Sequence, residues 1–390
     1  MKKIIALLLA LLLVAGLAAC GGGTPDPTPA PAPAAPAPAP AETPEPDEEP
    51  EPEEGFTASD IYIALVAHSP ESILDDGSFN EGAWNGIQRF LANHGLSDGH
   101  ARFFQPHSAD DVARVDLVAD AVGWGANIVV LPGFHFIDSS AEMQEMFPDV
   151  HFVLLDATPA GGPATNLAAI HYAEEQAGFL AGYAAVMEGY TSLGFMGGHA
   201  VPAVVRFGHG FLQGAEHAAE SLGLAEGDVT VNYFYVGGFA PSPEVATTAS
   251  AWFAGGTEVI FAAAGGAGFS VISGAEASGG SVIGVDVDQS GASDVVITSA
   301  MKALDVSVYD MLTDFLNGAF RGGVELMFDA SVNGIGLPMH TSRFQVFTQA
   351  QYDAIFALLA NGTIVVNNVV TPSVTEANLD LTLVTVVELN

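Results

Sequence analysis

Beyond residue 60, the chain alternates between short apolar runs and longer amphipathic stretches. Ile61 to Val66 is a continuous apolar run, which is typical of a strand buried in a parallel sheet. The stretch that follows has apolar residues at helical spacing. Ser78 and Glu81 have the spacing of a capping box at its start, and Gly95 is a stop signal at its end. The pattern therefore predicts a strand followed by a helix at the start of the folded region.

The same alternation recurs in two series along the chain. Further strands are predicted at 101–105, 128–131 and 151–156 in the first series, and at 192–196, 229–236, 259–264 and 282–286 in the second. Two such series predict an α/β fold with two doubly wound parallel-sheet lobes joined by a hinge. We place the first lobe at about 60–170 plus about 290–325, and the second at about 171–289 plus a C-terminal segment.

The loops that follow the predicted strands form the candidate site. Ligands of doubly wound sheets bind beyond the carboxyl ends of the strands. Several of these loops carry aromatic or acidic side chains, among them Phe134, Asp156, Phe239 and Asp286. Because the loops of both lobes would converge on one cleft, the arrangement is typical of a binding protein.

The N-terminal region has a different composition. Residues 1–19 combine two lysines, an apolar run and small residues before Cys20, which is the pattern of a lipoprotein signal peptide. We expect Cys20 to carry a lipid anchor; the alternative is an ordinary secretory signal with an incidental cysteine. Residues 20–55 hold more than half of the chain's 23 prolines and predict an extended tether. The solute-binding domain, 56–390, would then lie on the extracytoplasmic face of the cell membrane.

The charge and the cysteine content of the chain argue against several classes of protein and of binding site. The chain has 9 Lys+Arg against 46 Asp+Glu, a net charge of −37, which repels phosphate backbones and argues against nucleic-acid binding. Its single cysteine excludes an internal disulfide and a cysteine-based zinc site. The histidines are dispersed, and the loop that starts at Asp286 has Ile297 where a calcium loop requires a glutamate. We therefore expect neither a metal nor a cofactor.

Nine short blocks of sequence carry a further signal. In chain order they are Asp75-Asp76-Gly77-Ser78-Phe79-Asn80 with Trp84-Asn85-Gly86, Phe147 to Phe152, Phe179 to Tyr183, Gly194 to Gly198, Arg206-Phe207, Gly210-Phe211, Ala263 to Gly266, Gly284 to Ser290 and Ser299 to Lys302. In order and spacing, these blocks resemble the basic membrane protein (Bmp) family of ABC transporter substrate-binding lipoproteins, which includes purine-nucleoside receptors. The resemblance extends from about Asp60 to Val366.

The resemblance implies a type I periplasmic-binding-protein fold that closes on a nucleoside. It implies that Phe79 and Phe207 stack on the base and that Asp156 reads base nitrogens. It assigns the ribose to Asp286 and Lys302. The backbone amides near Gly265 and Gly266 belong to the same ribose-binding set. The remaining candidates for the cleft are Asp76, Asn80, Phe134 and Phe239. The implied partners are a separate ABC permease and its ATPase.

Lys302 stands out without the resemblance. It is the only lysine beyond residue 3 in a chain from which surface lysine is almost absent. We expect it to have a required role, either as a contact to the ribose or as the partner of a buried aspartate. A structural ion pair with Asp286 or Asp305 would produce the same sequence. With Arg206 as the only other cation expected nearby, the acidic chain favours a neutral nucleoside over a nucleotide.

Other interpretations remain open at the level of sequence. Phe79 and Phe207 could be core residues of their helices, and Asp156 could be a turn former. A nucleoside hydrolase would need an acidic cluster directly after the first strand, but the loop there has one carboxylate pair only at its end. We therefore expect no catalytic residues. A receptor for signalling, or for another small solute such as a sugar, is the remaining alternative.

Overall fold

The computed structural model describes residues 57–389. The predicted signal peptide (1–19), the predicted lipidation site Cys20 and the whole predicted tether (20–55) therefore lie outside the described residues. The described residues belong to one compact unit. Within them, no helix has both the length and the apolar character needed to cross a membrane.

The first lobe contains a six-stranded sheet in which every neighbouring pair of strands is parallel. Its strand order is β11-β5-β4-β3-β1-β2, so the chain crosses over the sheet between neighbours. The strands are β1 (Ile63–Val66), β2 (Ala101–Phe104), β3 (Ile128–Pro132), β4 (His151–Leu155), β5 (Leu167–Tyr172) and β11 (Val324–Phe328).

The second lobe contains a seven-stranded sheet of order β12-β10-β9-β8-β6-β7-β13. Only the pairing of β12 with β10 is antiparallel. The strands are β6 (Ser192–Gly197), β7 (Val229–Tyr235), β8 (Val259–Ala263), β9 (Ser281–Asp286), β10 (Val296–Lys302), β12 (Ile335–Gly336) and β13 (Val384–Glu388). The prediction of two parallel-sheet lobes is confirmed, and each strand predicted from its apolar run is present.

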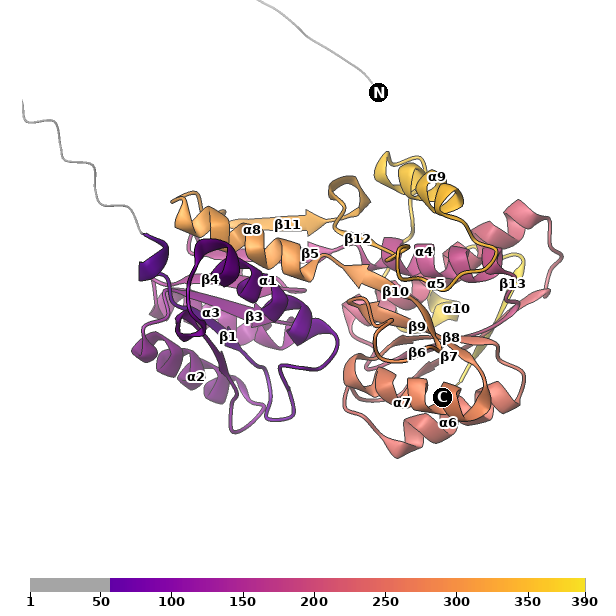
Figure 1. The fold of residues 1–390 in the computed structure, drawn as a ribbon, viewed down its shortest axis with the longest axis horizontal. Coiled ribbons are helices and arrows are strands. Elements are labelled where there is room, and N and C mark those ends of the chain that lie inside the picture. The colour runs from indigo at the N-terminus through magenta and orange to yellow at the C-terminus, as the bar shows by residue number, and fades with distance from the viewer. Residues whose placement is uncertain (1–56, 390) are drawn as a thin grey trace, which may run out of the picture. The chain divides into compact units, whose positions relative to one another are not determined.

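Helices cover both faces of each sheet (Figure 1). In β1, Ile63 and Leu65 pack toward one cluster of apolar residues, whereas Ala64 and Val66 pack toward another. A parallel sheet covered in this way is apolar on both faces, which is why its strands are continuous apolar runs. The helices are α1 (Phe79–His94), α2 (Asp111–Trp124), α3 (Ile137–Met146), α4 (Glu174–Glu188), α5 (Pro202–Leu222), α6 (Pro243–Ala254), α7 (Gly268–Ser278), α8 (Leu304–Leu316), α9 (Gln349–Ala360) and α10 (Val374–Ala377).

The chain passes between the two sheets at three places, which are joined by backbone hydrogen bonds. Ala173 donates its N–H to the carbonyl of Phe328, at 3.1 Å, and Ala303 donates to Gly334, at 2.9 Å. These crossings form the hinge. The predicted return to the first lobe near residue 290 is wrong, because β10 extends the second sheet. The return begins only at α8, which packs against α1.

The start of α1 differs from the predicted capping box. Ser78 is the N-cap residue, but its hydroxyl makes no capping bond. The carboxylate of Asp76 accepts the backbone N–H groups of Ser78, Asn80 and Glu81 instead. Asp76 can do this because the loop turns at Gly77, which has a φ of 61°. The predicted stop at Gly95 is confirmed by its left-handed conformation.

The C-terminal segment belongs to the second lobe, as predicted. β13 pairs with the edge strand β7 in parallel. Glu216, on α5, accepts backbone N–H groups from Thr382, Leu383 and Val384. A single carboxylate therefore fixes the entry into β13, and these hydrogen bonds lower the pKa of Glu216 although its partial burial opposes the shift.

Candidate functional site: a cavity between the two lobes

A cavity of about 690 Å³ lies between the carboxyl ends of the strands of the two lobes. This volume is in the range of small-molecule sites. Every one of the eleven predicted ligand-binding residues lines it: Asp76, Phe79, Asn80, Phe134, Asp156, Phe207, Phe239, Gly265, Gly266, Asp286 and Lys302. The fold therefore brings together residues that are up to 226 positions apart in sequence. Their contact with a ligand stays a prediction.

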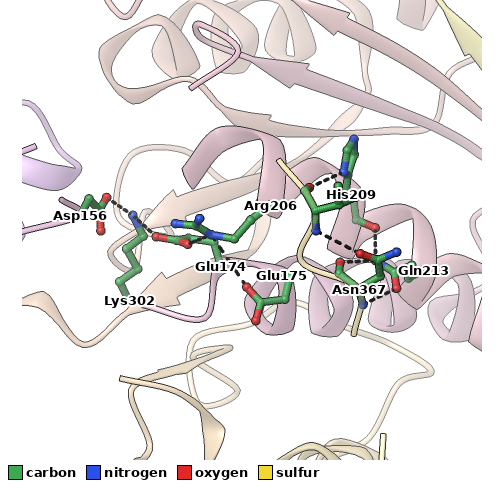
Figure 2. Close-up of polar contacts among 9 residues, drawn as sticks. Asp156, Glu174, Glu175, Arg206, His209, Gln213, Lys302 and Asn367 are labelled. Carbon is green, nitrogen blue, oxygen red and sulfur yellow. Dashed lines mark hydrogen bonds and ion pairs between the residues drawn. The ribbon is translucent and has the colours of Figure 1, made fainter. Parts of the chain in front are cut away.

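Lys302 is at the centre of a buried group of carboxylates. Its side chain is 2% exposed, and Nζ lies 2.6 Å from Oδ2 of Asp156, in the other lobe (Figure 2). Oε1 of Glu174 is 3.2 Å from the same nitrogen, and Oδ1 of Asp286 is 3.7 Å away. The lysine thus pairs with buried aspartates, which is one of its two expected roles. Asp305, the other candidate partner, instead pairs with Arg89.

Glu174 carries the charge network onward to α5. Nε of Arg206 lies 2.6 Å from Oε2 of Glu174, which is completely buried (Figure 2). The two helices can approach closely because a Cβ at Gly178 or Gly182 of α4 would overlap backbone atoms of α5. Arg206 is therefore occupied by a carboxylate and does not line the cavity, contrary to its predicted place near the ligand. The arginine that does line the cavity is Arg114.

Asp156 and Asp286 reach Lys302 from equivalent positions in the two lobes. Asp156 follows β4 and Asp286 ends β9, and both have left-handed backbones, with φ of 58° and 66°. Residues other than glycine rarely adopt this conformation, although aspartate tolerates it better than most. The same turn at the ends of two strands places one carboxylate from each lobe beside the single lysine.

The protonation of the network follows from burial and pairing. Burial raises the pKa of Asp156, and the charge on Lys302 opposes that shift. Burial also acts against the positive charge of Lys302, but the surrounding carboxylates raise its pKa above the usual range. Although burial opposes it, Lys302 and Arg206 together lower the pKa of Glu174. Lys302 therefore remains charged.

Two buried oxygens of this network accept no hydrogen bond from the described residues. One is Oε1 of Glu174, which lies 3.2 Å from Nζ of Lys302, and the other belongs to Asp156. Oδ1 of Asp156 is buried and has no hydrogen-bond partner among the residues that the structure describes. The Asp156 residue lines the cavity, so a ligand N–H or O–H that reaches this oxygen would supply its missing hydrogen bond. A buried acceptor without a partner costs about 1–3 kcal/mol, so a ligand N–H or O–H at this point would stabilise the complex.

Aromatic rings surround the ammonium group. Nζ of Lys302 lies 4.9 Å from the ring centre of Phe79 and 5.2 Å from that of Phe207, within range of a cation–π interaction. Phe79 is partly exposed, whereas Phe207 is buried and packs edge-on against Phe261. Phe207 lines the cavity and also belongs to the core of the second lobe, so its position is compatible both with stacking on a ligand and with core packing.

Asp76 and Asn80 line the cavity while also holding the loop before α1. The amide of Asn80 donates to the carbonyl of Ile73, and Asp76 caps the helix. Burial raises the pKa of Asp76 to about 6, and its backbone hydrogen bonds oppose that shift. These two residues shape the wall with polar atoms that are already bonded within the loop.

A second cluster on the cavity wall is aromatic. His68 and His135 stack in parallel at 4.1 Å, and Phe134 lies 3.9 Å from the ring of His135. From the second lobe, His199 contacts Phe239 edge-on at 5.4 Å. Burial lowers the pKa of His68 to about 3 and that of His135 to about 4. Both of these imidazoles are therefore neutral at pH 7.

Sequence reasoning missed the histidines of this cluster and Glu174. Spacing offered no signal for the histidines, because they come from three separate loops. Glu174 did offer one, since it opens a helix directly after a strand. A carboxylate at that position is ordinary helix chemistry, however, and its pairing with Lys302 depends on the packing of α4.

Comparison with known protein families identifies the family of this chain. Residues 63–368 match the family model described as Bmp, ABC transporter substrate-binding protein PnrA-like. The chain belongs to the Bmp family. The resemblance of its sequence blocks is thereby confirmed. The family description is that of a substrate-binding protein and not of an enzyme.

Curated relatives agree with this assignment. The chain is 27% identical over 312 residues to the ABC transporter nucleoside-binding protein BmpA of Lactococcus lactis, covering 75% of this chain and 85% of the relative. It is 26% identical over 306 residues to basic membrane protein A1 of Borrelia garinii, covering 76% and 86%.

Solved structures support the fold. An ABC transporter system solute-binding protein from Conexibacter woesei superposes with a TM-score of 0.63 at 25% identity, covering 79% of this chain and 99% of that one. A solute-binding protein from Aeropyrum pernix has the same TM-score at 22% identity, covering 79% and 88%. The Bmp chain thus has the two-lobed periplasmic-binding-protein architecture.

Proposed function

We propose that this protein captures a purine nucleoside on the outer face of the cell membrane and delivers it to an ABC permease. The observation that carries the proposal is the unpartnered Oδ1 of Asp156, buried in the wall of a cavity whose other lining groups include Phe79 and Phe207. A purine nucleoside offers such an oxygen a ring N–H, as in inosine, an amino group, as in adenosine, or both, as in guanosine, and it offers flat faces to the two phenylalanines. The name of the Lactococcus lactis relative supports the same class of ligand.

In this proposal the charged and aromatic groups have separate tasks. Phe79 and Phe207 stack on the base, and Asp156 accepts its hydrogen bonds. Asp286 and Lys302 bind the ribose hydroxyls, with Gly265 and Gly266 allowing a close approach of the backbone. The side chains of Asp76, Asn80, Phe134 and Phe239 complete the wall. Stacking contributes about 1–3 kcal/mol per ring, and a hydrogen bond to a charged group about 1.5–3 kcal/mol.

The charge pattern favours a nucleoside over a nucleotide. Lys302 is surrounded by three carboxylates. Arg114 donates to Asp111 and to the carbonyls of His68 and Ala109. Both cations on the cavity wall are therefore already neutralised, and a phosphate would enter a negative field.

For transport, the protein would also need a membrane anchor, a tether and a separate transporter. Cys20 would carry the lipid anchor, residues 20–55 would act as the tether, and a permease with its ATPase would supply the membrane path and the energy. The ligand would favour the closed arrangement of the lobes because it contacts both of them, and the permease would recognise that arrangement. These statements rest on the family and on the sequence pattern.

The test is the thermal unfolding of the full-length protein with adenosine, guanosine, inosine, cytidine, AMP, adenine and ribose. Refolding from denaturant first removes any ligand that copurifies. A ligand at 100 times its Kd adds about 2.7 kcal/mol, which raises Tm by several degrees. We expect purine nucleosides to give this shift and AMP to give none. The nucleoside claim fails if no nucleoside shifts Tm, and equal shifts with AMP contradict the charge argument.

A variant separates recognition from general stabilisation. Asp156→Asn removes the carboxylate acceptor and keeps the shape of the side chain, so we expect it to abolish the purine shift. Asp314→Asn is the matched control, because Asp314 pairs with Arg321 at the surface and does not line the cavity. A full purine shift in Asp156→Asn would contradict the assigned role of Asp156.

A further inference from the structure

Two hydrogen bonds join the lobes beside the cavity. Oγ of Ser78, in the first lobe, donates to Oδ2 of Asp286 at 2.6 Å. Nε2 of Gln289, in the second lobe, donates to the carbonyl of Gly77 at 2.8 Å. Ser78 is 0% exposed and Gln289 is 6% exposed, yet neither lines the cavity. These two residues therefore act between the lobes and not on the contents of the cavity.

The local structure frees Ser78 for this bond. At an N-cap position a serine hydroxyl normally accepts an N–H group of its own helix. Here Asp76 accepts the N–H groups of Asn80 and Glu81, so the hydroxyl of Ser78 is left to donate across the gap. Capping by a neighbouring residue is thus what turns this serine toward the other lobe.

Gln289 is held in position by its own lobe. Its Oε1 accepts the N–H of Val285 at 3.1 Å, and its backbone N–H donates to Oγ of Ser299 at 3.0 Å. A Cβ at Gly284 would overlap the amide of Gln289, so only glycine leaves room for the side chain there. The amide is fixed in advance with Nε2 directed at the first lobe, which reduces the entropy cost of the bond.

Gly77 allows the lobes to come this close. A Cβ on Gly77 would overlap the ring of Phe269, which belongs to α7 of the second lobe. The backbone of the first lobe therefore packs directly on a side chain of the second at the point where Gln289 bonds it. Asp286 connects this contact to the cavity, since its other oxygen faces Lys302 at 3.7 Å.

We propose that Ser78 and Gln289 form an inter-lobe latch that holds the two lobes together and slows the release of the ligand without touching it. The proposal rests on the proposed function, in that the cavity is taken as the nucleoside site. Bonds that exist only while the lobes are together stabilise the closed state, so their loss increases the open fraction. Because a larger open fraction lets the bound ligand leave more often, the loss of the latch speeds dissociation.

The first experiment measures nucleoside release from the full-length protein. In Ser78→Ala and in Gln289→Glu, which keeps the Oε1 acceptor but removes the donor, we expect dissociation of bound guanosine or inosine to become about tenfold faster. The association rate should be no slower than that of the native protein, because the open fraction is larger. Ser140→Ala is the matched control, because Ser140 is equally buried but donates within its own lobe, to Ile137. Release at the native rate in both latch variants overturns the proposal.

The second experiment uses hydrogen exchange on the ligand-free protein. We expect faster exchange in the peptides 76–82 and 285–290 of Ser78→Ala, and native exchange in both peptides of Ser140→Ala. If the native protein binds no nucleoside, the proposed function fails, while this measurement still decides the latch. Unchanged exchange in both peptides would overturn it. If Ser78→Ala does not fold, Gln289→Glu decides the outcome by the same two measurements.

Discussion

Two clusters of side chains on the cavity wall differ in their charge: one contains buried ion pairs, and the other contains neutral rings. The charged cluster, formed by Asp156, Asp286 and Lys302, is buried and held by ion pairs within and between the lobes. The aromatic cluster, formed by Phe134, Phe239 and three histidines, is more exposed, and two of its imidazoles are kept neutral by burial. The chain carries a net charge of −37, yet its only lysine beyond residue 3 is buried in the charged cluster.

This difference indicates that the two clusters have different roles in binding a ligand. Groups with fixed charge can orient the polar edges of a ligand, because a low local dielectric strengthens their hydrogen bonds. Neutral rings can cover the flat parts of a ligand without selecting an orientation. Substitutions in the charged cluster should therefore have large effects, and those in the aromatic cluster small ones.

The largest effect is expected at Lys302. In Lys302→Met, three buried carboxylates lose their shared cation, and we expect the free energy of unfolding to fall by about 3–5 kcal/mol with loss of nucleoside binding. Denaturant unfolding and calorimetric titration measure the two quantities. Arg321→Met is the control, because this arginine pairs with Asp314 at the surface and should contribute less than about 1 kcal/mol. Native stability in Lys302→Met would show that the cluster does not depend on charge matching.

An intermediate effect, which depends on pH, is expected at Glu175 beside the charged cluster. Burial, with the charge of Glu174, raises the pKa of Glu175 to about 7. A carboxyl whose folded pKa exceeds its unfolded value favours folding when protonated, and this stability is lost as the pH rises from about 4.5 through about 7. Glu175→Gln should therefore stabilise the protein by about 1–3 kcal/mol at pH 8 and have little effect at pH 4.

Unfolding in denaturant at several pH values measures the effect at Glu175. The exposed Glu226→Gln is the control for removing a surface charge. A constant difference between Glu175→Gln and the native protein from pH 4 to pH 8 would contradict the raised pKa.

The smallest effect is expected at His135 in the aromatic cluster. Because its imidazole is already neutral above a pH of about 4, replacing it by leucine removes no charge. We expect the nucleoside affinity of His135→Leu to stay within about threefold of native between pH 5 and pH 8. Calorimetric titration at both pH values measures it. A loss as large as that of Lys302→Met would remove the distinction between the two clusters.

Much of the architecture was predictable because its signals are local. A strand such as β1 is apolar on both faces, with Ile63 and Leu65 on one and Ala64 and Val66 on the other, so its run is visible in the sequence. The isolation of Lys302 pointed to a required role, and it does pair with buried aspartates. The ends of these elements were harder to predict from the sequence. The capping of α1 by Asp76, for example, depends on how the preceding loop turns.

The sequence by itself determined the two-lobed α/β architecture, the family and eleven of the residues on the cavity wall, because each depends on periodicity or on short motifs. Only the tertiary structure decided how these residues pair. Lys302 meets Asp156 and Glu174 because β10 belongs to the second sheet and α4 packs tightly on α5. Ser78 meets Asp286, 208 positions away, because the lobes touch beside the cavity. Such pairings depend on the distance between elements in space, which no local pattern encodes.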